Sequence, residues 1–224
     1  MSIIYEKDNQ NIVTLTFDTP GKPVNVINPE FIAELQQALE RFWADESVVG
    51  LILTSAKNSF IAGGDIDTIF EMSDPQATFK FVESFKALIR HMETMGKPVA
   101  AALNGTAVGG GLEMALACHY RVALAHPKSK FGLPEVTWGL LPGGGGLTRL
   151  TRLLGLQAAF PFLVEGNQVN AQEALKAGII HELATDRLEL LQKAHTWILN
   201  NPQAAQPWDQ KGYKMPGGDP SKPQ

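Results

Sequence analysis

The chain is poor in cysteine, and several features that mark particular classes of protein are absent from it. Cys118 is the single cysteine among 224 residues, so no internal disulfide can form, which fits a reducing compartment. No apolar run reaches the roughly 18 residues that a helix needs to cross a bilayer. The start, Met1–Glu6, has neither the basic residues of a secretory signal nor an arginine-rich transit character. We therefore expect a cytoplasmic protein without a membrane span.

The chain also lacks an excess of positive charge and a compact group of metal ligands. Its 19 Lys and Arg residues against 23 Asp and Glu residues leave a net charge of −4, which argues against a general nucleic-acid binder. The five histidines are dispersed along the sequence, and none belongs to a helical carboxylate-histidine motif. We expect neither a nucleic-acid partner nor a metal site.

Two glycine clusters are prominent, Gly109–Gly111 and Gly143–Gly146, but neither fits a common nucleotide-binding motif. A P-loop requires a lysine and a serine or threonine directly after its last glycine, whereas Leu112 and Leu147 follow the clusters here. A dinucleotide fingerprint requires Gly-x-Gly-x-x-Gly, which neither cluster reproduces cleanly after a strand. A Gly-x-Ser-x-Gly nucleophile elbow is also missing. Nucleotide binding and serine hydrolase chemistry therefore have little support.

What the sequence does contain is an alternation of short apolar strands and amphipathic helices. The predicted strands form a hairpin, at Ser2–Glu6 and Asn11–Phe17, and then buried runs at Val48–Thr54, Pro98–Leu103 and His119–Ala125. Strands separated by helices of about ten or more residues indicate an α/β fold with a mainly parallel sheet. Ligands usually bind at the carboxyl ends of such strands.

Helices are predicted between and after these strands. Asn28-Pro29 and Asp74-Pro75 each combine a capping residue with a proline at the first helical position. The second helix has an apolar stripe that begins at Phe79 and includes Phe85, so it should pack on a core. Further helices are predicted at 147–154, 156–164, 171–177 and 186–201, with a short strand at 179–183 before the last.

The stretch Asn104–Glu113 joins an apolar run to a helix through three glycines. Amides at the start of a helix are unpaired and point outward, so they suit an anion or a developing oxyanion. Glu113 follows in the first helical turn, where the helix dipole favours a carboxylate. Donors beside a potential proton carrier indicate a catalytic site. A tight turn capped by Glu113 explains the same residues equally well, and the stretch alone leaves both interpretations open.

A second glutamate could complete such a site. Glu135 lies 22 residues beyond Glu113, between Pro134 and Val136. An ordinary loop position is the commoner role for a lone glutamate. Paired with Glu113 across a cleft, Glu135 could instead transfer protons, and each such carboxylate typically contributes ~10²–10⁴-fold to the rate.

Four motifs in register give the chain a family resemblance. They are Phe60-Ile-Ala-Gly-Gly-Asp-Ile, Asn104-Gly-Thr-Ala-Val-Gly-Gly-Gly-Leu-Glu, Leu133-Pro-Glu and Leu141-Pro-Gly-Gly-Gly-Gly. In this order and spacing the sequence resembles the crotonase (enoyl-CoA hydratase/isomerase) superfamily. The resemblance implies a crotonase-like ββα superhelix with a mainly parallel sheet and, here, a truncated C-terminal helical part. More narrowly, the chain looks like the N-terminal hydratase part of a multifunctional fatty-acid β-oxidation enzyme.

The resemblance also implies roles for individual residues. The amides of Gly64 and Gly110 would form the oxyanion hole for the thioester oxygen, and Glu113 and Glu135 would hold a water molecule and move its protons. The amide of Gly143 would orient that water. The path of coenzyme A and its pantetheine arm would be lined by Val24, Ala62 and Ile66. The implied reaction is hydration of 2-enoyl-CoA, and coenzyme A is then part of the substrate rather than a cofactor.

The same resemblance divides the chain into parts. Residues 1–185 would be the hydratase core, 186–201 a C-terminal helix, and 202–224 a linker toward a 3-hydroxyacyl-CoA dehydrogenase domain that this sequence does not include. NAD would be expected only for that domain, and the full-length parent would pair with a thiolase. Isomerisation of the enoyl double bond at the same site, or non-catalytic binding of acyl-CoA, are the alternative functions. The oligomeric state and the activity of the fragment stay open.

Overall fold

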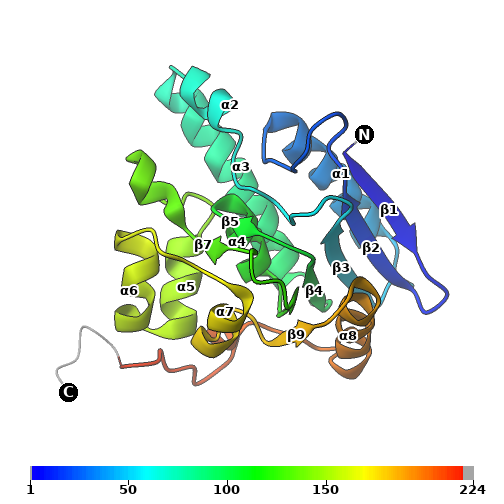
Figure 1. Cartoon of the computed structure of the whole chain (residues 1–224). Helices are drawn as coiled ribbons and strands as arrows, with labels where there is room; N and C mark the ends of the chain where they lie inside the picture. The colour runs from blue at the N-terminus through cyan, green and yellow to red at the C-terminus, as the bar shows by residue number, and fades with distance from the viewer. Residues whose placement is uncertain (1, 219–224) are drawn as a thin grey trace.

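A six-stranded sheet runs through the centre of the molecule. The computed structural model describes residues 2–218, and the strands lie in the order β1-β2-β3-β4-β6-β9 (Figure 1). The first two strands form the expected antiparallel hairpin, and every later neighbour is parallel. The strands are β1 (Ile3–Lys7), β2 (Ile12–Phe17), β3 (Gly50–Ser55), β4 (Val99–Leu103), β6 (Tyr120–Leu124) and β9 (Glu182–Ala184). The predicted α/β fold with a mainly parallel sheet is confirmed.

Both faces of this sheet are covered by helices, so the strands are apolar on both sides. Leu51 and Leu53 of β3 point into a core shared with α1 (Pro29–Ala44) and α3 (Pro75–Thr94). Ile52, between them, belongs to a second core, on the other face, which is covered by α8 (Arg187–Asn200). This alternation is the period of two that a strand imposes.

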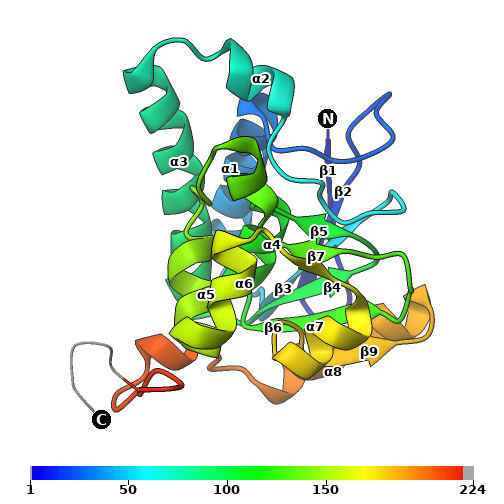
Figure 2. The same ribbon diagram turned by 60° about the vertical axis from the view of Figure 1, so that its left-hand side comes forward.

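The starts of α1 and α3 follow from their capping residues. The side chain of Asn28 accepts a hydrogen bond from the amide of Phe31 at 2.8 Å, and that of Asp74 accepts from Gln76 at 3.0 Å. Such a cap stabilises a helix by about 1 kcal/mol. The predicted apolar stripe of α3 is wrong at Phe79, which is 65% exposed. The first turns of α3 extend beyond the sheet (Figure 2), and burial begins at Phe85.

Several short elements were not predicted because they have too few residues to show a period. A small second sheet contains β5 (Ala107–Val108), β7 (Phe131–Gly132) and β8 (Gln168–Val169). Two helices of fewer than two turns lie where loops were expected, α2 (Ile66–Glu71) and the 3₁₀ helix η1 (Pro134–Trp138). The helix that was expected after the glycine turn is α4 (Gly110–Ala117), which lies between β5 and β6 and is buried from Gly111 to Ala117. These elements surround the glycine turn after β4.

The later helices lie close to their predicted positions, as α5 (Gly146–Leu154), α6 (Leu156–Val164) and α7 (Ala171–Ala177). The strand predicted at 179–183 is wrong at its start, because β9 begins only at Glu182. After Gly178 turns with φ +80°, the amides of Ile179 and Ile180 bond back to the carbonyl of Ala174. These two isoleucines are apolar because they are buried under α7, not because they form the sheet.

The segment 201–218 lies against the folded body in Figure 2. It contains residues 202–218 of the predicted linker, and the rest of that linker, 219–224, lies outside the described residues. It contains a short 3₁₀ helix, η2 (Pro207–Asp209). The buried amide of Gln206 donates to the carbonyls of Leu116 and Cys118 at 3.1 and 3.2 Å, at the C-terminal end of α4. The lone cysteine, Cys118, is fully buried there, and burial raises the pKa of its thiol to about 12. Among residues 2–218, no helix combines the length and apolar character that a membrane span requires.

Candidate active site

Three glycine-containing loops meet beside the N-terminus of α4. The first, Ala62–Asp65, follows β3, and isolated parallel bridges tie its surroundings to the chain at Ile27 and Ala107. The second is Gly109, which has φ +54° and leads directly into α4. The third is the run Gly143–Gly146, which leads into α5. These loops come from distant parts of the sequence, and the parallel sheet brings the first two to the same edge.

The amides of Gly64 and Gly110 lie next to one another. A Cβ placed on Gly110 would be 3.8 Å from the nitrogen of Gly64. Within residues 2–218, neither amide donates to a protein acceptor. The backbone bridge at Gly64 is made by the residues on either side of it, and Gly110 is the first residue of a helix, where amides have no partner within the helix. Two adjacent free donors form the arrangement that an oxyanion needs.

Glu113 points from the first turn of α4 toward these donors. Its side chain is almost fully buried, and the amide of Gly146 donates to its Oε1 at 2.8 Å. Burial raises the pKa of Glu113, while hydrogen bonds from the amides of Gly146, Gly144 and Gly145 and the charge of Arg149 act in the opposite direction. The glycine run is therefore a cradle for this carboxylate.

Glu135 faces the same space from η1. Its Oε2 is buried and has no hydrogen-bond partner among the described residues, so it is free to contact a ligand. Burial, followed by repulsion from Glu113, raises the pKa of Glu135 to about 7. A Cβ on Gly109 would lie 3.1 Å from Oε1 of Glu135, which shows how closely this carboxyl approaches the start of α4. Two carboxyls with raised pKa values share one site, and such pairs are typical of proton-transfer chemistry.

Two cavities that share lining residues are bordered by most of the predicted site residues. The smaller has a volume of about 190 Å³, and five predicted residues line it: Gly64, Gly110, Glu113, Glu135 and Gly143. The larger, of about 530 Å³, is lined by Ala62 and Ile66. Gly64 and Glu135 border both cavities. A ligand could therefore place one end against the glutamates while the rest extends into the larger space.

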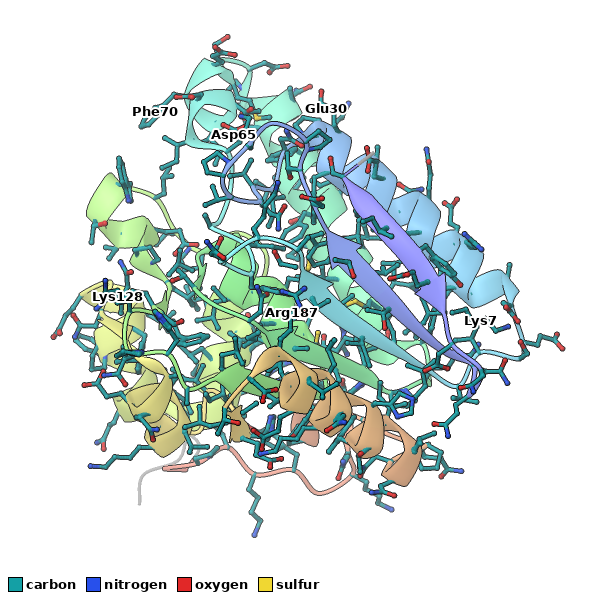
Figure 3. All side chains as sticks on the ribbon, turned by 45° about the vertical axis from the view of Figure 1, so that its right-hand side comes forward. Lys7, Glu30, Asp65, Phe70, Lys128 and Arg187 are labelled. Carbon is teal, nitrogen blue, oxygen red and sulfur yellow. The ribbon has the colours of Figure 1, made fainter. Side chains whose placement is uncertain are left out.

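Val24 is the one predicted residue that lines neither cavity among the described residues. It is half-buried and precedes Asn25, whose carbonyl accepts from the amide of Ala62 at 2.9 Å. Val24 therefore lies in the irregular segment between β2 and α1 that is hydrogen-bonded to the Ala62 loop. Apolar side chains complete the walls, with Phe85 and Val82 at the smaller cavity. The exposed Phe70 of α2 borders the larger cavity and lies at the upper edge of the molecule near Asp65 (Figure 3).

The sequence did not identify the groups that hold Glu113. The amides of Gly144 and Gly146 could have been suspected, because they belong to a glycine run that opens a helix. Glu93 and Arg149, which form a buried ion pair behind that run, gave no signal. They are 56 residues apart and sit in helices where charged residues are usually solvent-exposed.

Comparison with known proteins gives the family. The sequence matches the family described as "Enoyl-CoA hydratase/isomerase" over residues 7–206. The chain belongs to this enoyl-CoA hydratase/isomerase family. The enoyl-CoA hydratase of Bacillus anthracis, 29% identical, superposes with a TM-score of 0.82, covering 89% of this chain and 76% of that one. This similarity confirms the predicted crotonase-like fold, since hydratase structures of this family share the architecture described above.

The curated relatives that this chain matches are longer proteins. Fatty acid oxidation complex subunit alpha of Shewanella frigidimarina is 37% identical over 200 residues, which is 89% of this chain and 28% of the relative. The corresponding subunit of Shewanella halifaxensis is 39% identical over 183 residues, or 81% of this chain and 26% of the relative. The chain therefore spans little more than a quarter of the length of these relatives. The expected resemblance to one part of a fatty-acid oxidation protein is confirmed.

Proposed function

We propose that the chain is an enoyl-CoA hydratase unit that adds water across the 2,3 double bond of 2-enoyl-CoA thioesters. The observation that carries the proposal is the smaller cavity, where two carboxyls, Glu113 and Glu135, face two free amides, those of Gly64 and Gly110. The family membership supports an acyl-CoA substrate. A non-catalytic binding domain would have no need for two carboxyls with raised pKa values at the same cavity.

The amides act on the thioester. The carbonyl oxygen of the thioester lies between the amides of Gly64 and Gly110. These amides stabilise the negative charge that develops on the oxygen, and C3 becomes electrophilic. One well-placed donor of this kind lowers the barrier by roughly 2.7–4 kcal/mol. Both glycines lie in close packing, since a Cβ on Gly64 would be 2.7 Å from Ile69 and a Cβ on Gly110 would be 2.7 Å from Ile27.

The two glutamates act on the water. Glu113 accepts a hydrogen bond from Gly146, which favours its carboxylate form, so it takes the proton from water as the hydroxyl adds to C3. Glu135, with a pKa near 7, is protonated in a large share of molecules at neutral pH and gives its proton to C2. One water molecule is consumed, and the proton passes back between the coupled carboxyls afterwards. Gly143, at the same cavity, supports the water.

Hydration of crotonyl-CoA by the full-length protein tests this proposal. Loss of the enoyl chromophore should be catalysed, and Glu113→Gln and Glu135→Gln should each lower kcat by about 10²- to 10⁴-fold. Glu165→Gln, an exposed glutamate outside the cavities, is the matched control. Unchanged rates in both active-site variants would rule out the mechanism.

The same assays separate the alternative functions. An isomerase would convert 3-enoyl-CoA faster than it hydrates crotonyl-CoA, and a binding domain would hold acyl-CoA tightly without turnover. The presence of two carboxyls favours the hydratase, because moving a proton between C2 and C4 requires only one.

The domain assignment is also part of this proposal. We place the hydratase core at 1–185, the helix at 186–201 and a connecting segment at 202–224, by analogy with the longer relatives. A following dehydrogenase domain would use NAD, and the whole protein would act with a thiolase in the cytoplasm. The reading frame that encodes the chain tests this directly, since a nucleotide-binding β-α-β unit should follow Gln224.

A further inference from the structure

A row of charged side chains connects the C-terminal segment to the back of the active site. Asp209, in η2, accepts two hydrogen bonds from the guanidinium of Arg90 on α3, at 2.7 and 2.8 Å. Arg90 also donates to Oε2 of Glu93, one turn further along α3, at 2.8 Å. Two parallel bonds between a guanidinium and a carboxylate fix the orientation of both groups. The segment is therefore attached to α3 at a defined point.

Glu93 passes the connection to α5. Its carboxylate is buried and accepts from Nε and Nη2 of Arg149 at 3.1 and 2.8 Å. The Arg149 side chain is only 7% exposed. A buried guanidinium needs such a partner, because an unpaired charge in this position would be strongly destabilising. Glu93 thus determines where the guanidinium of Arg149 lies.

The remaining nitrogen of that guanidinium reaches the glycine turn. Nη1 of Arg149 donates to the carbonyl of Gly144 at 2.9 Å. Gly145 has φ +97°, and a Cβ there would lie 2.6 Å from the same nitrogen, so the turn bends closely around the guanidinium. On its other side the turn presents the amide of Gly146 to Glu113. Arg149 and Glu113 hold opposite sides of one turn.

We propose that Arg149 is a positioning residue for Glu113, and that docking of the C-terminal segment through Asp209 completes its alignment. Three nitrogens of one planar fork are used at once, two on Glu93 and one on Gly144. A lysine in the same place would keep the charge but could not reproduce the fork. The role rests on the proposed function, in which Glu113 takes the proton from water. It also makes residues 201–218 part of the catalytic unit.

Kinetics of the full-length protein with crotonyl-CoA test the proposal. Arg149→Lys should lower kcat by about 10- to 100-fold and change KM by less than about twofold, because the proton acceptor moves while the thioester site stays intact. Asp209→Asn should lower kcat by up to about fivefold, since Arg90 and Asp209 are partly exposed and such pairs are weak. The control is Asp45→Asn, which breaks the Lys7–Asp45 pair at the C-terminal end of α1, outside both cavities.

Hydrogen exchange gives a second measurement that does not depend on activity. Peptides that span the turn before Arg149 should exchange faster in Arg149→Lys and in Asp209→Asn, and should be unchanged in Asp45→Asn. The proposal is overturned if kcat is retained in both variants, if KM changes as much as kcat, or if the turn exchanges at the unaltered rate. An unaltered protein that does not hydrate crotonyl-CoA would instead refute the proposed function, while faster exchange of the turn in Asp209→Asn would still support the coupling.

Discussion

The carboxyl of Glu135 has a higher pKa in the folded protein than in the unfolded chain. Burial and the neighbouring charge of Glu113 raise its pKa from 4.5 to about 7 in the folded protein. The folded state therefore binds a proton more tightly than the unfolded state does between these values. Stability must fall as the pH rises through this range, because the folded state then has to keep an ionised carboxylate in a poor environment.

Replacing this carboxyl should consequently stabilise the protein at alkaline pH. We expect Glu135→Gln to raise the free energy of unfolding by about 1–3 kcal/mol at pH 8, allowing for partial exposure, and to have little effect at pH 4.5. Urea denaturation at the two pH values measures the difference. Glu6→Gln changes an exposed glutamate and is the control. A Glu135→Gln protein that is less stable than its parent at pH 8 would contradict the assigned environment.

At the residue scale, the sequence predicted the position of a residue correctly where that residue belonged to a motif. Gly64, Gly110, Glu113 and Glu135 all lie at one cavity as the resemblance implied. Val24 does not line it, and its neighbour Asn25 is hydrogen-bonded to the Ala62 loop. Glu93 and Arg149 could not have been predicted, since nothing local in the sequence indicates that two distant charged residues will be buried together. Their roles depend on the tertiary packing of α3 against α5.

The element that matters most for the proposed chemistry is α4. Its first residue supplies a donor, its first turn supplies a carboxylate, and the rest is buried in the core. Gly111 allows this helix to lie directly on the preceding loop, because a Cβ there would meet the carbonyl oxygen of Ile61 at 2.3 Å. The carbonyl belongs to the stretch that leads to Gly64. One small residue thereby fixes the separation of the two amide donors.

Enlarging this residue should disturb both stability and catalysis. We expect Gly111→Ala to destabilise the fold by about 1–3 kcal/mol through overpacking, and to lower kcat at least tenfold because Gly64 and Gly110 move apart. Thermal denaturation and crotonyl-CoA hydration by the full-length protein measure the two effects. Gly21→Asn is the control, since Gly21 has open space around it and asparagine tolerates its φ of +68°. Unchanged kinetics would show that the donors are not set by this contact.

The longer elements were predictable for a simple reason. α1, α3 and α8 each begin at a residue whose side chain caps the helix, at Asn28, Asp74 and Asp186. Their apolar positions recur over enough turns to show a period. The two-residue strands and the shortest helices have too few residues to show such a period. The strand expected at Ile179 was wrong because burial against a helix produces the same apolar pair.

For the whole molecule, the C-terminal segment is an integral part of the fold. Gln206 is buried, and its side-chain nitrogen donates to the carbonyls of Leu116 and Cys118 at the end of α4. The carbonyl of Cys118 also accepts from Nη1 of Arg121 at 2.6 Å. Tyr213 also bonds to the carbonyl of Arg152 on α5. The sequence predicts a linker here, whereas in the structure the segment packs against one side of the core.

Removing the Gln206 amide should therefore weaken the entire domain. We expect Gln206→Ala to lower the free energy of unfolding by about 1–3 kcal/mol, because the buried carbonyl of Leu116 loses its donor, while that of Cys118 keeps the bond from Arg121. Urea denaturation followed by circular dichroism provides the measurement. Gln203→Ala, at an exposed position three residues earlier, should have an effect below about 0.5 kcal/mol. Equal effects of the two substitutions would mean that the segment is only loosely attached.

The position of Cys118 has a consequence for how the domain can be observed. This thiol lies under Gln206 with no exposed surface and a pKa near 12, so neither reagent nor ionisation is available to it while the core is closed. A thiol label on this residue, located by peptide mass spectrometry, thus records only opening of the core. The rate of labelling at Cys118 therefore measures how often the core opens. Local fluctuations at the surface, which leave the core closed, do not contribute to it.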